Sequence, residues 1–417
     1  MGNTFMSSPS YLWTSESVTE GHPDKVCDQI SDAVLDAVIG QGSQVRVACE
    51  TAATFGVVNV MGEITAKEVP DYERIARDTL RRIGYASDDV GLSADTCRVH
   101  VLVHGQSPEI AASVQAAWEV RTAAKRGQAD PLDQMGAGDQ GMMLGFACDE
   151  TEQWWPGVHM PLPIFLSHRL CQRLTELRNK RVVPYLRPDG KSQVTVEYRY
   201  GVPVRVAAVI LAAQHDPSVN REKLQKELNE LVVRHVIPQE LLDDRTEVRI
   251  NTSGSFIMGG PAADTGLTGR KILVDTYGSM ARHGGGAFSG KDPTKVDRSG
   301  AYAARHMAKN VVAAGLAKRC EVQVAYAIGV ARPLNVSVET FGTNAIPDEK
   351  IVALLNRHFD MRPAAIIRDL ELWQPIYRQT AAYGHFGRPG LNLPWERDSK
   401  AKALATEAGI APPTAHR

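Results

Sequence analysis

The sequence lacks several features that would assign it to a specialised class of protein. Its formal net charge is only -1, so the overall charge does not favour binding to nucleic acid or to an anionic membrane. No stretch approaches the roughly 18 consecutive apolar residues that a membrane-spanning helix needs. The first residues, MGNTFMSSPSYLW, contain no basic region followed by an apolar run, and we therefore expect no signal peptide.

Cysteine is also scarce, and its spacing does not suit the common metal and redox motifs. The chain has 6 cysteines, none of them in a CxxC pair, and most lie within apolar stretches. This distribution is typical of buried, reduced thiols. We therefore predict a reducing, cytoplasmic location.

The chain contains one order of predicted elements three times: a helix, two strands and a second helix. Its 417 residues suggest about three domains of roughly 150 residues each. Glycines near the short connections between the strands, Gly56, Gly201 and Gly329, favour antiparallel hairpins. The three sets are predicted at 22–40, 45–50, 57–65 and 68–83; at 163–179, 193–200, 203–214 and 221–236; and at 298–318, 320–328, 334–341 and 348–358. We predict an α+β fold of three pseudo-threefold-related units, with mainly antiparallel sheets and helices on one face.

One segment fits none of these units. Residues 108–129 are rich in alanine and charge and contain no turn signal. Both a surface helix and a mobile lid over a site agree with this composition, and the spacing does not separate the two.

The densest cluster of candidate functional residues is HGGGAFSGKDPTKVDRS at 283–299. Gly285 to Lys291 matches the GxxxxGK part of a phosphate-binding loop, but Asp292 stands where a Ser or Thr would hold magnesium. Its glycines, together with Lys291 and Lys295, still suit an anion, because backbone N–H and ammonium groups converge on such a ligand. The alternative is a flexible glycine loop with solvated lysines.

Two aspartates are candidate ligands for magnesium, which prefers carboxylate and phosphate oxygens. They are Asp24, in EGHPDK at 20–25, and Asp297. His22 precedes Asp24, and a histidine near a helix start is more often a cap or packing residue than a catalytic one.

Two further glycine-containing segments add charge. DTGLTGRK at 264–271 contributes Arg270 and Lys271, and GAGDQG at 136–141 contributes Asp139. Each alone would be read as an ordinary turn, but together the clusters supply metal ligands and phosphate-directed cations.

These segments resemble the S-adenosylmethionine synthetase family, and the resemblance runs from about residue 12 to 397. The matching motifs are TSESVTEGHPDK at 14–25, GAGDQG at 136–141, LRPDGKSQVT at 186–195, DTGLTGRKI at 264–272, HGGGAFSGKDPTKVDRS at 283–299 and TAAYGHFGR at 380–388. The resemblance implies an enzyme that transfers the adenosyl group of ATP to the sulfur of L-methionine and cuts the displaced triphosphate into phosphate and diphosphate. It also implies an N-terminal domain at 12–110, a gating loop at 111–132, a central domain at 133–250 and a C-terminal domain at 251–397.

The resemblance also implies a role for individual residues. Catalysis would involve His22, Lys191, Arg270, Lys271 and Lys291. ATP would be bound by the same five and by Asp139, Asp189, Phe256, Asp264 and Ala287; methionine by Glu63, Gln106, Asp264 and Lys295; two Mg²⁺ ions per site by Asp24 and Asp297; and K⁺ by Glu50. In NTSGSF at 251–256, Ser255 replaces the family's usual arginine beside the nucleotide.

The family resemblance further implies a homodimer with shared active sites, assembled into a homotetramer. It places His22, Ala287 and Lys291 on one chain, and Lys191, Arg270 and Lys271 on the partner. Two other functions stay open at this point. One is an NTPase or kinase that uses the glycine loop at 283–292, and the other is a catalytically silent nucleotide-binding partner.

Overall fold

The computed structural model describes residues 4–90, 92–106, 116–123 and 130–411. Half of the predicted gating loop at 111–132 lies outside these residues; within it, Trp118–Ala123 forms helix α5. No helix in the described part of the chain is long and apolar enough to cross a membrane. All six cysteines are described, and each is buried and free, as the sequence predicts.

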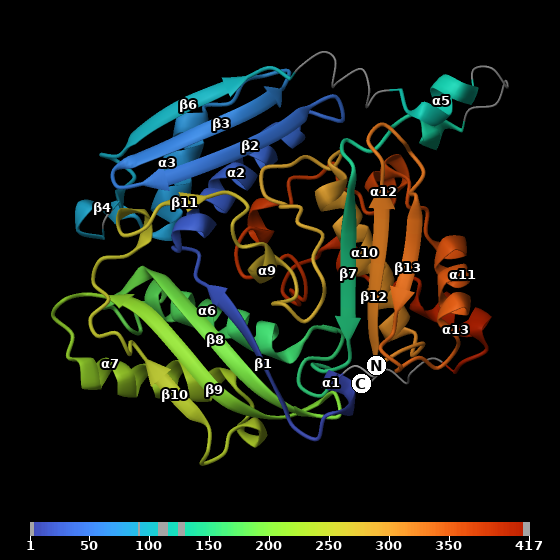
Figure 1. Ribbon diagram of the computed structural model, residues 1–417. Coiled ribbons are helices and arrows are strands. Elements are labelled where there is room, and N and C mark those ends of the chain that lie inside the picture. Colours follow the sequence, from blue (N-terminus) through green and yellow to red (C-terminus); the bar gives the residue numbers. More distant parts are fainter. Residues whose placement is uncertain (1–3, 91, 107–115, 124–129, 412–417) are drawn as a thin grey trace.

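Three predicted hairpins are confirmed, and each lies in a different sheet (Figure 1). The first joins β2 (Arg46–Thr54) to β3 (Val57–Thr65), the second joins β8 (Leu186–Arg199) to β9 (Val202–His215), and the third joins β12 (Arg319–Tyr326) to β13 (Asn335–Glu339). All three pairs are antiparallel. The fold is therefore α+β with mainly antiparallel open sheets. Pseudo-threefold symmetry between the units stays a prediction.

The predicted helices flank these hairpins. They are α2 (Pro23–Ile39) and α3 (Tyr72–Ile83) in the first unit, α6 (Leu162–Asn179) and α7 (Arg221–Leu228) in the second, and α10 (Val296–Ala313) and α11 (Asp348–His358) in the third. The helix predicted over 221–236 is interrupted, because a π-helical turn over Asn229–Val233 separates α7 from α8 (Arg234–Val236).

Each sheet also contains edge strands that the sequence analysis missed. β11 (Gly266–Leu267) and β6 (Arg98–His104) extend the first sheet, β1 (Tyr11–Val18) and β10 (Glu247–Ile250) the second, and β7 (Gly141–Cys148) the third. Several come from distant parts of the chain: β1 pairs with β8 and β7 pairs with β12. β6 and β10 pair in parallel with their neighbours. The three units are thus joined by strand pairing as well as by packing.

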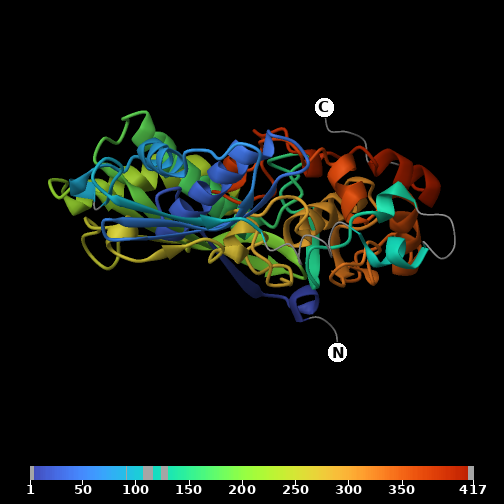
Figure 2. The same ribbon diagram turned by 90° about the horizontal axis from the view of Figure 1, so that it is seen from above.

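The first two sheets have one covered face and one open face. In β2, Val47 and Cys49 are buried against α2, whereas the alternate residues Ala48 and Glu50 lie on the other face, which no helix covers. In the second sheet, Val194 and Val196 are buried on the side of α6. Seen from above, the helices of these two units lie on one side of the sheets (Figure 2). The described chain therefore leaves two broad sheet faces uncovered.

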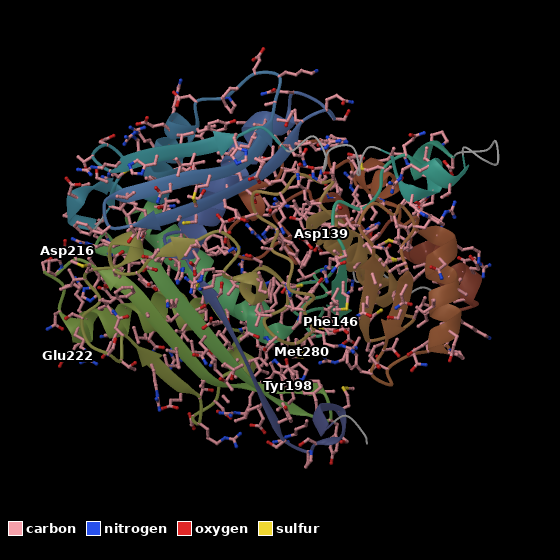
Figure 3. The ribbon with its side chains drawn as sticks, turned by 45° about the horizontal axis from the view of Figure 1, so that its top comes forward. Asp139, Phe146, Tyr198, Asp216, Glu222 and Met280 are labelled. Atoms are coloured by element: carbon pink, nitrogen blue, oxygen red, sulfur yellow. The ribbon has the colours of Figure 1, made fainter. Side chains whose placement is uncertain are left out.

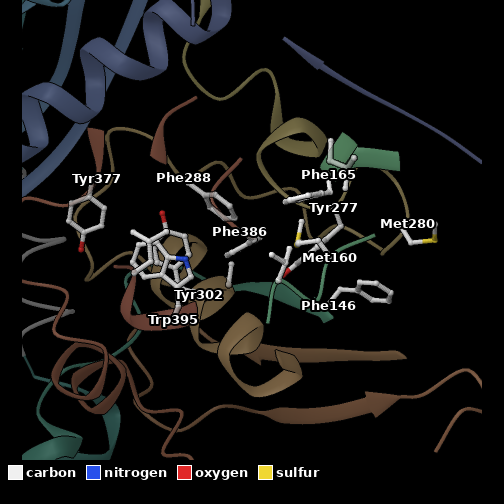
Figure 4. Packing of buried hydrophobic residues seen from close by; sticks show 14 of the residues in the cluster. Phe146, Met160, Phe165, Tyr277, Met280, Phe288, Tyr302, Tyr377, Phe386 and Trp395 are labelled. Atoms are coloured by element: carbon white, nitrogen blue, oxygen red, sulfur yellow. The ribbon is translucent and has the colours of Figure 1, made fainter. Parts of the chain in front are cut away.

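The core continues from one unit to the next (Figure 4). Tyr302 on α10 stacks on Trp395 with ring centroids 3.9 Å apart, and Phe386 and Phe288 pack at its other edges. Phe288 belongs to the glycine-rich segment and Phe386 to the TAAYGHFGR motif, so aromatic packing fixes both segments against α10. This packing supports the loops that carry the candidate site.

Candidate active site

The edge of strand β2 brings two of the glycine-rich segments together. Thr268 N–H donates to the Thr51 carbonyl at 3.0 Å, and the N–H of Cys49 donates to the Gly290 carbonyl at 2.9 Å. A Cβ on Gly290, which has φ of +78°, would lie 1.8 Å from the Cys49 carbonyl oxygen, so only glycine fits this approach. Two motifs that lie far apart in the sequence therefore run along one strand.

A stripe of acidic residues on α2 anchors these segments and was missed by the sequence analysis. Asp24, Asp28, Asp32 and Asp36 recur every four residues, which places them along one side of the helix. They accept backbone N–H groups from three other segments: Asp24 from Leu267, Asp28 from Gly269, Asp32 from Gly290, and Asp36 from Tyr377 and Arg378, at 2.8–3.0 Å. The four-residue spacing was a visible signal. Only the folded chain shows what the carboxylates hold.

The acidic stripe is partly neutralised by buried cations. Lys25 lies between Asp28, at 2.9 Å, and Asp275, and Arg298 forms a two-pronged contact with Asp32 at 2.7 and 2.8 Å. All of these side chains are buried. Because each buried charge has an opposite partner, the stripe is a rigid base for the loops above it.

His22 caps the N-terminus of α2 and is 3% exposed. Its Nδ1 accepts the backbone N–H of Asp24 at 3.2 Å. Burial, with the nearby charges of Lys271 and Lys191, lowers the pKa of His22 to about 3. The ring is therefore neutral near pH 7, and because Nδ1 is an acceptor the proton resides on Nε2. His22 presents a neutral N–H donor.

Each aspartate predicted to bind magnesium is paired with a lysine predicted to bind polyphosphate. Lys271 Nζ lies 2.5 Å from Asp24 Oδ2, and Lys291 Nζ lies 2.6 Å from Asp297 Oδ2. Burial would raise the pKa of Asp24, but the hydrogen bonds from Lys271 and the Leu267 N–H outweigh it and hold the pKa below its ordinary value. Both pairs are half-buried. In each pair the lysine could bind an oxyanion and the carboxylate could bind a metal ion.

The second pair lies against the glycine-rich segment. A Cβ on Gly286 would be 2.7 Å from Asp297 Oδ1, so the loop passes directly over this carboxylate. Ala287 in the same loop contacts Gly269 of the neighbouring segment: a Cβ on Gly269 would lie 2.6 Å from that of Ala287. Ala287, Lys291 and Asp297 therefore lie next to the segment that carries Arg270 and Lys271.

The structure does not support a P-loop at 285–292. Asp292 is fully buried and accepts from the Val47 N–H at 2.7 Å, from Thr294 and from Lys295 Nζ at 2.5 Å. Lys291 forms a bridge with Ala48 of β2, and helix α10 begins only at Val296. A P-loop would pass from the lysine directly into its helix. Asp292 and Lys295 instead hold the turn that leads into α10.

A second group of predicted ATP contacts lies at the ends of β8 and β9. Asp189 accepts the Gly260 N–H at 2.8 Å, and Phe256 exchanges hydrogen bonds with His215 at 2.9 and 3.1 Å. Burial, together with the charge of Asp264, raises the pKa of Asp189 to about 6, although the Gly260 N–H and Lys191 oppose this shift. Its Oδ1 is buried and has no partner among the described residues. A ligand N–H or O–H donor would satisfy this atom.

The remaining predicted residues are more exposed. Glu50 and Glu63 lie on the open face of the first sheet, where Glu63 is 3.4 Å from His104, and Gln106 follows β6. Lys191 and Arg270 are exposed, as is Asp139, which lies near the centre of the molecule in Figure 3. A Cβ on Gly138 would lie 3.2 Å from the Thr294 carbonyl, so GAGDQG adjoins the turn that carries Lys295.

The structure corrects the division of residues between two chains. His22, Lys191 and Lys271 lie close enough within one chain for both lysines to lower the pKa of His22, and Lys271 contacts Asp24 two residues away. The expectation that Lys191 and Lys271 face His22 from the partner is therefore wrong. The error arose because the sequence cannot show that β11 and β8 both pass beside the start of α2.

Known proteins resemble this chain along nearly its whole length. Family models for the N-terminal, central and C-terminal domains of S-adenosylmethionine synthetase match residues 10–108, 134–256 and 258–397. A protein of Roseiflexus castenholzii named S-adenosylmethionine synthase is 58% identical over 412 residues, which cover 98% of this chain and 100% of that protein. The three models together cover nearly the whole chain, and on these findings the chain belongs to the S-adenosylmethionine synthetase family.

Proposed function

We propose that this protein is a methionine adenosyltransferase, in which the sulfur of L-methionine attacks C5′ of ATP and displaces the whole triphosphate, which is then cut to phosphate and diphosphate. The observation that carries the proposal is the convergence of His22, the pair Asp24–Lys271 and the pair Lys291–Asp297 on loops fixed by β2 and α2. This convergence agrees with the family to which the chain belongs.

The chemistry explains why cations rather than a base dominate the site. A thioether sulfur has no proton to lose when it attacks carbon, so no general base is required. The leaving triphosphate carries several negative charges, and catalysis depends on preorganised positive charge and N–H donors where that charge develops. Lys271, Lys291, Arg270 and Lys191 supply the charge, and the neutral Nε2–H of His22 supplies a donor near the breaking bond.

Magnesium fits the donor set of the site. Within the described residues, no three His, Cys, Asp or Glu side chains cluster to hold a metal. Mg²⁺ does not need such a cage, because it commonly takes one or two carboxylates and completes its shell with phosphate oxygens and waters. Asp24 and Asp297 would hold two ions, which would neutralise charge on the triphosphate. The family resemblance assigns K⁺ to Glu50 and methionine to Glu63, Gln106, Asp264 and Lys295, and we include these roles in the proposal.

The lysine–aspartate pairs give the site a defined response to its substrates. Lys271 and Lys291 lie 2.5 and 2.6 Å from the carboxylates of Asp24 and Asp297. If these carboxylates held magnesium, which would supply positive charge to the triphosphate, the two ammonium groups would be free to turn toward the polyphosphate. The partial exposure of both lysines, 21% and 29%, leaves room for this movement.

A second copy of the chain completes the site in our proposal. Glu50, Glu63 and Lys191 lie on open sheet faces, where Glu50 and Lys191 are exposed and Glu63, beside His104, is partly exposed. An isologous dimer in which these faces meet would enclose the charged substrate between two surfaces and strengthen each cation. We further propose that such dimers assemble into a homotetramer. A cytoplasmic location completes the proposal and is consistent with six buried free cysteines.

Product analysis tests the reaction. Purified protein incubated with ATP, L-methionine, Mg²⁺ and K⁺ should yield the adenosylsulfonium product, phosphate and diphosphate in equal amounts by mass spectrometry and phosphate assay. ATP hydrolysis that proceeds equally without methionine would instead favour an NTPase. Tight ATP binding without any product would favour the silent nucleotide-binding partner.

A charge placed on the open face tests the dimer. Ile210 lies part-buried on the open face of β9. We expect Ile210→Arg to yield monomers in analytical ultracentrifugation and to lose activity together with assembly. Val202, which is 60% exposed at the hairpin, provides the control Val202→Arg, which should stay assembled and active. A fully active monomer would contradict the shared site.

A further inference from the structure

The TAAYGHFGR motif at 380–388 ends in an arginine whose environment differs from that of the other buried cations. Arg388 Nη1 donates to the carbonyls of Ala382 at 2.7 Å and Gly384 at 3.0 Å. Lys25, Arg298 and Arg305 each have a carboxylate partner. Among the residues that the structure describes, no carboxylate lies within ion-pair distance of Arg388, and its Nε and Nη2 have no hydrogen-bond partner. The charge of this part-buried cation therefore meets only two carbonyls and the Tyr383 ring, whose centroid lies 5.9 Å from its Cζ, and no carboxylate among the described residues.

Arg388 lines a small cavity between α6 and the segment that follows the motif. The cavity has a volume of about 150 Å³, and its lining contains Arg169 and Gln172 of α6 besides Arg388. No aspartate or glutamate belongs to this lining, and no residue assigned above to ATP, methionine or a metal does. Arg169 is exposed and likewise has no ion pair within the described ranges. The cavity thus combines two cations with no anion.

The size and the donors of the cavity define its ligand class. Pockets for drug-sized molecules measure roughly 300–1,000 Å³, so a cavity of about 150 Å³ holds a much smaller group. A guanidinium presents its N–H groups in a fixed fork that matches the oxygens of phosphate or carboxylate. Burial lowers the pKa of Arg388 to about 10, because Tyr383 opposes the shift only in part. A bound anion would offset the free-energy cost of burying the charged guanidinium of Arg388.

We propose that the cavity at Arg388 and Arg169 binds one small tetrahedral oxyanion of the phosphate type, separate from the catalytic site. Arg388 offers its free Nε and Nη2 edge from one side, while Arg169 and Gln172 close the other side from α6. Inorganic phosphate and a phosphate group of a larger molecule share this chemistry.

The site is connected to the catalytic segment through Tyr383, which also lines the cavity. The Tyr383 hydroxyl accepts the backbone N–H of Glu20 at 3.3 Å and donates to Thr175 at 2.8 Å. Glu20 precedes His22 by two residues. An anion that orders the 383–391 segment would therefore also stiffen the chain that leads into the N-terminus of α2.

Direct observation tests the site first. Crystals of the full-length protein are soaked in selenate, a tetrahedral oxyanion with an anomalous signal. We expect an anomalous peak within hydrogen-bond distance of the Arg388 guanidinium, in native crystals and in the Lys291→Ala variant. A native crystal that shows selenate at the catalytic cations but none at Arg388 would overturn the proposal.

Solution binding tests the contribution of the arginines. Inorganic phosphate is titrated by calorimetry into the full-length enzyme, with acetate as the carboxylate arm and chloride to hold ionic strength constant. We expect two classes of phosphate site in the native protein, and the class that persists in Lys291→Ala to weaken at least tenfold in Arg388→Gln. Stronger binding of acetate than of phosphate would overturn the assignment to a tetrahedral oxyanion.

Arg169→Gln provides a second test in case Arg388→Gln fails to fold, since the Arg169 side chain is exposed and makes no hydrogen bond to another residue that the structure describes. Arg169→Gln should weaken the same class of phosphate site at least tenfold and leave kcat at low phosphate unchanged. Lys226→Gln, an exposed cation on α7, is the matched control and should bind phosphate as the native protein does. Equal phosphate binding by native protein and Arg169→Gln would refute the site, whereas the outcome of the product analysis is independent of it.

Discussion

Removal of the ammonium group of Lys291 should slow the chemical step while leaving methionine binding nearly intact. Lys291 is 29% exposed, and its Nζ lies 2.6 Å from Asp297, in the loop that we assign to the departing triphosphate. At about 4 Å and an effective dielectric constant of about 20, one unit charge contributes roughly 4 kcal/mol. Loss of a single preorganised partner usually costs about 2.7–4 kcal/mol of transition-state stabilisation. We therefore expect Lys291→Ala to lower kcat by about 10²–10³.

The assay is steady-state formation of the sulfonium product, with KM for methionine expected within about twofold of the native value. The main alternative cause of a lower kcat in Lys291→Ala is that the carboxylate of Asp297 is left without its cation. Asp297 is only 22% exposed, so solvent screens its charge in part, and the cost of leaving it unpaired falls on the stability of the folded protein. The melting temperature of Lys291→Ala measures that cost separately from turnover. A loss of kcat below about threefold in Lys291→Ala would refute the role of Lys291.

The other predictions concern the anchors, the cations and the pH. Asp28→Ala removes the acceptor of the Gly269 N–H and should raise KM for ATP at least tenfold. Asp36 lies on the same stripe but binds the N–H groups of residues 377 and 378, so Asp36→Ala should lower the melting temperature and leave KM for ATP unchanged. Glu50→Gln should abolish the difference between K⁺ and Na⁺ in activity assays, and equal native activity in both ions would end that assignment. Burial lowers the pKa of His168 from 6.5 to about 3, so the unfolded chain binds a proton that the folded protein excludes. The free energy of unfolding should therefore fall as the pH drops below about 6.5, with a slope that approaches roughly 1.4 kcal/mol per pH unit for this residue. In His168→Gln the free energy of unfolding, measured with urea, should depend less on pH between about pH 7 and pH 5.

The sequence alone determined the three hairpins, most of their helices and the motifs of the site. Apolar periodicity is a local property, and hairpins join neighbouring segments, so neither needs the rest of the chain. The motif residues were identified in the same way, because each motif is a short contiguous string. The sequence also predicted the buried, unpaired state of all six cysteines.

Only the tertiary structure decided which motifs meet within the chain. β1, β7 and β11 join sheets far from them in the sequence, because a strand edge accepts any segment with matching N–H and C=O groups. The acidic stripe of α2 likewise acquires its role from backbone N–H groups more than 200 residues away, such as those of Leu267 and Gly290. Its regular spacing was visible in the sequence, but the spacing does not name its partners. His22 is neutral for the same reason: burial and two distant lysines set its pKa, and neither is encoded near residue 22.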